Sequence, residues 1–217
     1  MAISISLCSD KSTGNQELFK LLKSDLEWNM LEKTDDMITI SIKNLPGSDL
    51  NAVKVEKILQ LNPGIVSDII MDLDNYNRFL SNAQSLDTKI ISRSDNNLIG
   101  YQHISIDIPF FDDREYLFQI SKQEWIDESS TILCHWMLLD YEDTMNNKEI
   151  MKQATYLSYG AGVWQAKYLS PGNFNISYRL YMDPGGSIPD FLIDIINRES
   201  IVGLFRDVER EVISRSR

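Results

Sequence analysis

Residues 162–193 read GVWQAKYLSPGNFNISYRLYMDPGGSIPDFLI. Two runs of mostly aromatic and aliphatic residues flank the Pro171-Gly172 pair, which predicts two antiparallel strands joined by a tight turn. The run Asp183-Pro184-Gly185-Gly186 forms a second turn, after which Ser187 is placed to cap a helix. This stretch therefore predicts that the last strand of a sheet leads directly into a long C-terminal helix.

Both of these final elements have one apolar face. The strand over 173–183 alternates, so that one face carries Phe174, Ile176, Tyr178, Leu180 and Met182. The helix over 188–212 has an apolar stripe that covers about half of its circumference. That stripe consists of Ile188, Phe191, Leu192, Ile195, Ile196, Val202 and Gly203. We expect the two apolar surfaces to face each other.

The elements upstream of this stretch are predicted in the same way. Amphipathic spacing indicates a helix over 15–31, and Asn62-Pro63 is a good start for a helix over 63–71. A second short helix carries Tyr76, Phe79 and Leu80. Alternation and turn residues predict strands over 37–42, 53–61 (with a bulge), 88–94, 98–108, 114–126, 130–140 and 154–169, and a longer loop over 142–148.

This order predicts an α+β fold in which a curved antiparallel sheet wraps around the C-terminal helix, accompanied by two short helices and an N-terminal helix. The chain has no linker or internal repeat, so residues 1–217 are interpreted as a single domain.

Composition restricts the partners and the location. The chain has 32 acidic and 21 basic residues, and a net charge of −11 repels the phosphates of nucleic acids. Its apolar runs are too short to span a membrane. Cys8 and Cys134 are interpreted as reduced thiols, and the expected location is the cytoplasm. The sequence does not indicate an oligomeric state.

Three runs resemble the START family of the helix-grip group, which also includes Bet v 1 and polyketide cyclases. They are the stretch quoted above, IGYQHISIDIPFFDDREY over 99–116, and NPGIVSDIIMDLDNYNRFL over 62–80. The resemblance extends from about Val53 to Val212. It implies an internal cavity between the sheet and the last helix that holds a lipid or another hydrophobic molecule. The buried arginine of sterol-binding animal members is replaced here by Ile120, so a sterol is not implied.

The candidate ligand-binding residues follow from that cavity. They are Tyr101, His103, Trp136, Trp164, Phe174, Ile176, Tyr178, Leu192, Ile195 and Glu199. A filled core is the ordinary alternative for the apolar members. Glu199 lies in the apolar stripe of the helix, where a carboxylate needs a partner, a proton or a polar ligand. The aromatic Tyr159 is a further strand residue that could line a pocket. Apolar residues occur in both phases of the strands over 98–108 and 130–140, which leaves their inward face open.

Three functions remain open at this point. The leading hypothesis is a lipid carrier, sensor or presenter without catalytic residues. A cyclase or hydratase could use the same cavity, with His103, Tyr178 or Glu199 as acid or base. A protein-interaction module is the third. The only histidines, His103 and His135, lie in no metal-binding motif, so neither a metal nor a cofactor is expected. Arg114 and Glu115 are interpreted as an ion pair that braces a turn.

Overall fold

The computed structural model of the chain describes residues 11–107, 109, 111–123, 130–141, 148–186 and 190–216, without the side chains of 11–13, 130, 148 and 190–199. Residues 142–147 of the loop predicted over 142–148, Cys8 and the cap at Ser187 lie outside these residues.

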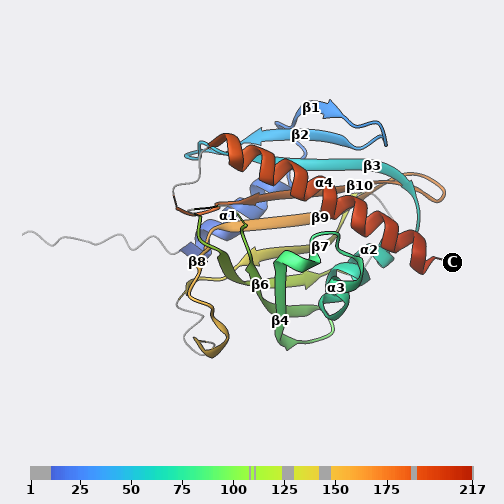
Figure 1. Cartoon of the computed structure of the whole chain (residues 1–217). Coiled ribbons are helices and arrows are strands. Elements are labelled where there is room, and N and C mark those ends of the chain that lie inside the picture. The colour runs from blue at the N-terminus through green and yellow to red at the C-terminus, as the bar shows by residue number, and fades with distance from the viewer. Residues whose placement is uncertain are drawn as a thin grey trace, which may run out of the picture.

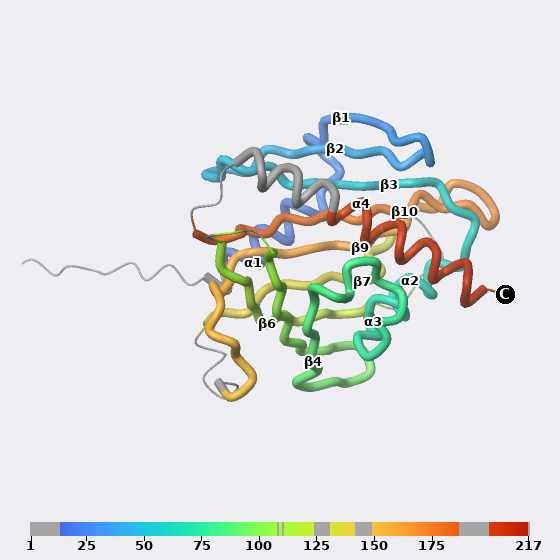
Figure 2. Tube along the Cα trace, in the orientation of Figure 1, coloured from blue at the N-terminus to red at the C-terminus, as the bar shows by residue number. Residues whose placement is uncertain are grey.

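One ten-stranded sheet forms the body of the molecule (Figure 1). Its strands are β1 (Asn29–Lys33), β2 (Thr39–Asn44), β3 (Asn51–Gln60), β4 (Leu86–Arg93), β5 (Asn97–Ile104), β6 (Arg114–Lys122), β7 (Ser130–Leu138), β8 (Thr155–Tyr156), β9 (Gly160–Ser170) and β10 (Asn173–Met182). The order is β1-β2-β3-β10-β9-β7-β6-β5-β4, with every neighbouring pair antiparallel, and the short β8 pairs in parallel with β6. β10 therefore lies beside β3, although the two strands are far apart in the sequence (Figure 2).

The helices cover both faces of this sheet. They are α1 (Lys11–Lys23), α2 (Pro63–Met71), α3 (Tyr76–Phe79) and α4 (Asp190–Arg215), with 3-10 turns at Leu73–Asn75, Ala83–Ser85 and Lys148–Ile150. α4 crosses one face obliquely, with α2 and α3 beside its C-terminal end, and α1 lies behind the sheet (Figure 1). The face toward α4 is called the inner face here, and the opposite face the outer face.

The predicted start of α2 is confirmed. The Asn62 side chain accepts a hydrogen bond from the Gly64 N–H at 3.0 Å, and Pro63 occupies the first turn, where no N–H is needed. The tight turn between β9 and β10 is also confirmed. Gly172 has a φ of +76°, a conformation that costs little only for glycine.

The helix predicted over 15–31 is wrong in its second half. α1 ends at Lys23, Glu27 has a left-handed φ of 65°, and residues 29–33 form the edge strand β1. Two buried basic side chains of the sheet donate hydrogen bonds to the carbonyl groups at the end of α1. Lys43 donates to Leu21 O at 2.8 Å, and Arg179 donates to Leu22 O and Lys23 O. This packing satisfies the helix terminus and lets the chain turn back toward the sheet.

Two further strand predictions need correction. The bulge predicted in 53–61 is wrong, because β3 pairs without interruption with both β2 and β10. Instead, Ile58 is simply exposed on the outer face. The strand predicted over 154–169 is divided into β8 and β9, since the chain leaves the edge of β6 before it pairs with β10.

Two apolar clusters hold these layers together. The larger one joins the inner face to α2 and to the second half of α4. The smaller one joins α1 to the outer face of β9 and β10, through residues such as Leu18, Leu22, Val163 and Tyr181. The sheet is thus the shared middle layer, and whatever α4 encloses must lie on the inner face.

Candidate functional site

The inner face is apolar from β3 to β5. Strand register brings together residues of one phase from each strand. They include Val55, Leu98, Phe118, Ile120, Cys134, Trp136, Leu138, Trp164, Ala166, Phe174, Ile176, Tyr178, Leu180 and Met182. The prediction that one face of β10 is buried is therefore confirmed, because Phe174, Ile176 and Tyr178 are all buried.

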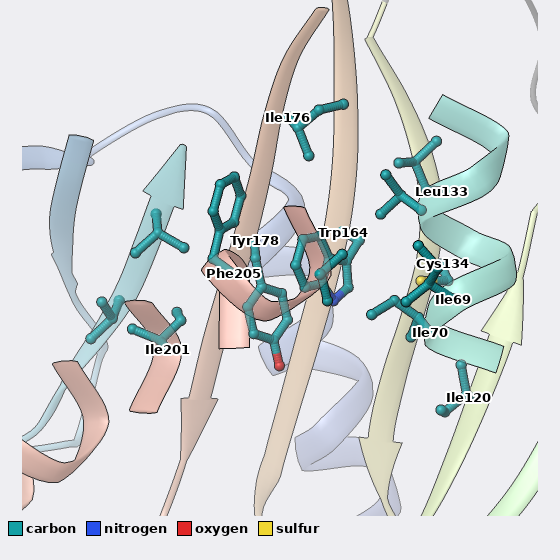
Figure 3. Packing of buried hydrophobic residues seen from close by; sticks show 14 of the residues in the cluster. Ile69, Ile70, Ile120, Leu133, Cys134, Trp164, Ile176, Tyr178, Ile201 and Phe205 are labelled. Carbon is teal, nitrogen blue, oxygen red and sulfur yellow. The ribbon is translucent and has the colours of Figure 1, made fainter. Parts of the chain in front are cut away.

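Half of this face is a filled core. Trp164 stacks on Tyr178 with ring centres 4.4 Å apart, and on Phe205 of α4 at 5.7 Å. Trp164 is only 1% exposed, and Ile69 and Ile70 of α2 pack into the same cluster (Figure 3). Trp164, Phe174, Ile176 and Tyr178 thus meet protein side chains, as the ordinary alternative to a cavity predicts.

The other half is less completely covered. Trp136, Leu180 and Met182 are adjacent by register, and each is only partly buried although it lies on the inner face. Gly162 lies between Trp136 and Leu180, and a Cβ at this position would be 2.3 Å from Nε1 of Trp136. The indole therefore lies against the glycine backbone. This accessible apolar patch lies where β10 runs out toward the start of α4.

The inner face carries an ion pair with α4, between Lys57 and Glu209, and several uncharged polar groups. Nε1 of Trp136 donates to the Tyr178 hydroxyl at 2.9 Å, and the Tyr116 hydroxyl bonds to Gln102 Oε1. Burial raises the pKa of Tyr178, of Tyr116 and of the Cys134 thiol well above their usual values. These groups can orient a ligand by hydrogen bonds, but they do not ionise near neutral pH.

Two predicted site residues, Tyr101 and His103, lie on the outer face instead. They alternate with the inward Gly100 and Gln102 of β5. The Tyr101 hydroxyl donates to Glu115 Oε2 at 2.9 Å, and His103 Nε2 lies 3.2 Å from Asp113 Oδ2. The sheet separates both side chains from the inner patch.

The second histidine and Tyr159 also belong to the outer face. His135 stacks on Phe19 of α1, with ring centres 4.3 Å apart. Tyr159 packs against Tyr181 in the cluster beneath α1. In β7 the register shifts between Ile132 and Cys134, which explains why apolar residues occur in both phases of this strand.

Three predicted residues come from the first half of α4. Leu192, Ile195 and Glu199 are helical, and their side chains lie outside the described part of the structure. Leu180 and Met182 belong to the patch and are not among the site residues that the sequence predicts. Their signal was the same alternation that identified Tyr178.

Arg114 braces the turn before α4, but through carbonyl groups rather than through an ion pair with Glu115. Its Nε donates to Pro184 O at 2.7 Å and its Nη2 to Gly185 O at 3.2 Å. Glu115 instead accepts from Tyr101 and from the backbone N–H groups of Lys152 and Ala154. The start of β6 is thereby tied to the turn that leads into α4.

The described parts of the chain contain no group of three potential metal ligands. Cys134 is a free thiol. None of the described helices is long and apolar enough to cross a membrane.

Comparisons with known proteins match the fold but not the sequence. No protein-family model and no curated protein matches the chain. Among solved structures, it is similar to human StAR-related lipid transfer protein 5, with a TM-score of 0.70, 12% identity, and coverage of 95% of this chain and 96% of that one. For a StAR-related lipid transfer protein fragment from Xanthomonas axonopodis, the TM-score is 0.67 and the identity 16%, and the match covers 86% of this chain and 98% of that one. For the Zhui aromatase/cyclase from Streptomyces sp. R1128, the TM-score is 0.53 and the identity 10%, and the match covers 76% of this chain and 95% of that one.

These likenesses, together with the sheet and its C-terminal helix, define the class of architecture as an α+β helix-grip fold. Within that class, the chain has the START type of fold, as its sequence pattern predicted.

Proposed function

We propose that the chain binds one lipid or other hydrophobic small molecule between the inner face of the sheet and α4, as a carrier, sensor or presenter. The observation that supports this most directly is the patch of Trp136, Leu180 and Met182. These side chains are apolar and face α4, yet they remain partly accessible beside a fully buried core. A ligand that covers them gains about 25 cal/mol per Å² of apolar surface removed from water.

The fold supports the same proposal. Two of the similar structures are StAR-related lipid transfer proteins. The proposed location is the cytoplasm, on the evidence of sequence composition and of the free thiol of Cys134.

An enzyme of the cyclase type is the second candidate, because an aromatase/cyclase has a similar fold. General acid–base catalysis needs a group that ionises near the working pH. Both histidines lie on the outer face, and the described tyrosines of the inner face have raised pKa values. The charged groups Lys57 and Glu209 of the inner face are paired with each other at 2.7 Å. Carriage without catalysis therefore fits the described inner face better.

The test is mass spectrometry of an organic extract from protein purified without detergent. We expect one class of hydrophobic molecule in a ratio near one per chain. The Leu180→Asp variant should lose it, because a carboxylate in an apolar pocket is strongly disfavoured. Ile58→Ser, which changes an exposed side chain on the outer face, is the matched control and should retain it.

Circular dichroism must show that Leu180→Asp is folded, and the milder Leu180→Ala variant supports the comparison if it is not. An extract that contains no hydrophobic molecule, together with no uptake of fluorescent fatty acid or phospholipid, would refute the carrier proposal. Conversion of a bound polyketide-like compound would favour the enzyme.

A further inference from the structure

The outer face of the sheet carries a groove that α1 leaves uncovered. Its polar end, with a volume of about 170 Å³, is lined by residues that include Lys54 and Arg179. Its wider end, of about 560 Å³, is lined by residues that include Met37, Ile58 and Leu169. Both ends share Glu56, Lys167 and Asn175, so they form one continuous groove.

The wide end has an exposed apolar wall. Met37 is 56% exposed, Ile58 63% and Leu169 46%, and Met30 nearby on β1 is 64% exposed. Exposed apolar residues that stand singly are normal, but a group on one surface indicates an interaction site. These residues come from three separate segments of the chain, and strand pairing brings the segments together.

The groove is basic, whereas the chain as a whole is strongly acidic, with a net charge of −11. Its basic residues are Lys33, Lys54, Lys167 and Arg179, against the acidic Asp25 and Glu56. Lys54 pairs with Glu56, and Arg179 pairs with Asp25. Lys33 and Lys167 are exposed and have no ion-pair partner within the described parts of the chain.

We propose that this groove binds a short extended segment of a partner protein that carries acidic residues next to large apolar ones. The apolar side chains of the segment would cover Met37, Ile58 and Leu169, and its carboxylates would meet Lys33 and Lys167. From Lys54 to Ile58 the groove follows β3 for about 13 Å, which matches four or five extended residues.

The shape of the groove favours a peptide over the other ligands. A small molecule needs a site that buries most of its surface, whereas the walls here are about half exposed. A membrane rich in anionic lipid would be repelled by the net charge of the chain. Because the groove lies on the opposite side of the sheet from the inner patch, a partner and a lipid can be bound together. This site is therefore independent of the proposed carrier function.

The test is fluorescence anisotropy with a labelled library of peptides about ten residues long, in which Asp or Glu adjoins Leu or Phe. We expect the best sequences to bind the full chain with a Kd of about 1–100 μM, and their Lys-substituted counterparts not to bind. The double variant Lys33→Glu with Lys167→Glu should weaken binding at least about tenfold, and Ile58→Ser at least about fivefold.

The matched controls make the same kind of substitution, a lysine to glutamate or an exposed apolar residue to serine, at positions outside the groove. Lys89→Glu and Tyr141→Ser, at other exposed positions, should change the Kd by less than about twofold. Absence of saturable binding below about 1 mM would overturn the proposal, and so would equal losses in the controls. Binding to vesicles of phosphatidylcholine and phosphatidylserine that requires Lys33 and Lys167, without peptide binding, would overturn it in favour of a membrane. Lipid content should be unchanged in every groove variant, so the two proposals fail separately.

Discussion

Arg114 Nε donates a hydrogen bond to the carbonyl oxygen of Pro184 at 2.7 Å, across 70 positions of sequence. Arg114 is only 5% exposed, and its guanidinium also reaches Gly185 O and the carbonyl of Asp112. Gly185 and Gly186 have φ values of +62° and +70°, so the turn itself is a conformation that favours glycine. Arg114 therefore ties the start of β6 to the turn that precedes α4.

Replacement of Arg114 by Met should loosen this turn. Hydrogen bonds that involve a charged group contribute about 1.5–3 kcal/mol, so amide exchange at 183–186 should rise by at least about tenfold. Mass-spectrometric hydrogen exchange measures the effect. Arg206→Met is the control, because it removes an ion pair between α4 and Asp36 without touching the turn. Unchanged exchange in Arg114→Met would show that the turn is held by other contacts.

Two glycines give opposite predictions for the same substitution. Gly162→Ala forces Trp136 from its place and should destabilise the fold by about 1–3 kcal/mol. A Cβ at Gly203 on α4 would have no atom within 4 Å. Gly203→Ala should therefore stabilise the fold by up to about 1 kcal/mol through helix propensity. Urea unfolding measures both, and tryptophan fluorescence should shift only in Gly162→Ala. If Gly162→Ala were neutral, the contact between the indole and the glycine backbone would be disproved.

The course of the fold could be predicted because its elements have local signals. Asn62-Pro63, Pro171-Gly172 and the alternation of β10 act within a few residues, and the structure confirms each of them. The end of α1 has no such signal. It depends on Lys43 and Arg179, which reach the helix from strands far along the chain.

The candidate site was harder to predict for a related reason. Alternation shows that two faces exist, but not which one meets α4. In β5, the side chains of Tyr101 and His103 point to the outer face. Their aromatic character alone suggests the inner face instead. In β7, the register shift at Ile132 removes the periodicity on which the prediction depends. Only strand pairing with β9 and β6 assigns Trp136 to the inner face.

The histidines should matter little for ligand binding. His103→Ala and His135→Ala should leave the affinity for a fluorescent fatty acid within about tenfold of the unmodified chain, because the sheet lies between these residues and the inner patch. Trp136→Ala should weaken the same probe by more than about tenfold, through loss of apolar contact. Titration of each variant with the fluorescent probe measures these affinities. A histidine variant that binds as poorly as Trp136→Ala would place the ligand on the outer face.

His135 should make the fold sensitive to acid. Its side chain is packed between β7 and Phe19 of α1, and its Nδ1 is buried without a hydrogen-bond partner among the described residues. Burial lowers its pKa below the ordinary histidine value of about 6.5, because the charged form would lose its hydration. The unfolded chain therefore binds a proton at a higher pH than the folded chain does. The contribution of neutral His135 to stability is fully present above about pH 6.5, and is lost as the pH falls toward the lowered value.

The measurement is urea unfolding from about pH 7.5 to about pH 5 in a His103→Gln background, where His135 is the only histidine. The chain that retains His135 should lose more free energy of unfolding on acidification than the same chain with His135→Gln. The carboxylates titrate in both proteins, so the difference between the two curves isolates the imidazole. Parallel curves, or a smaller loss with His135 present, would contradict the argument, since they would mean that the folded chain binds this proton as readily as the unfolded one.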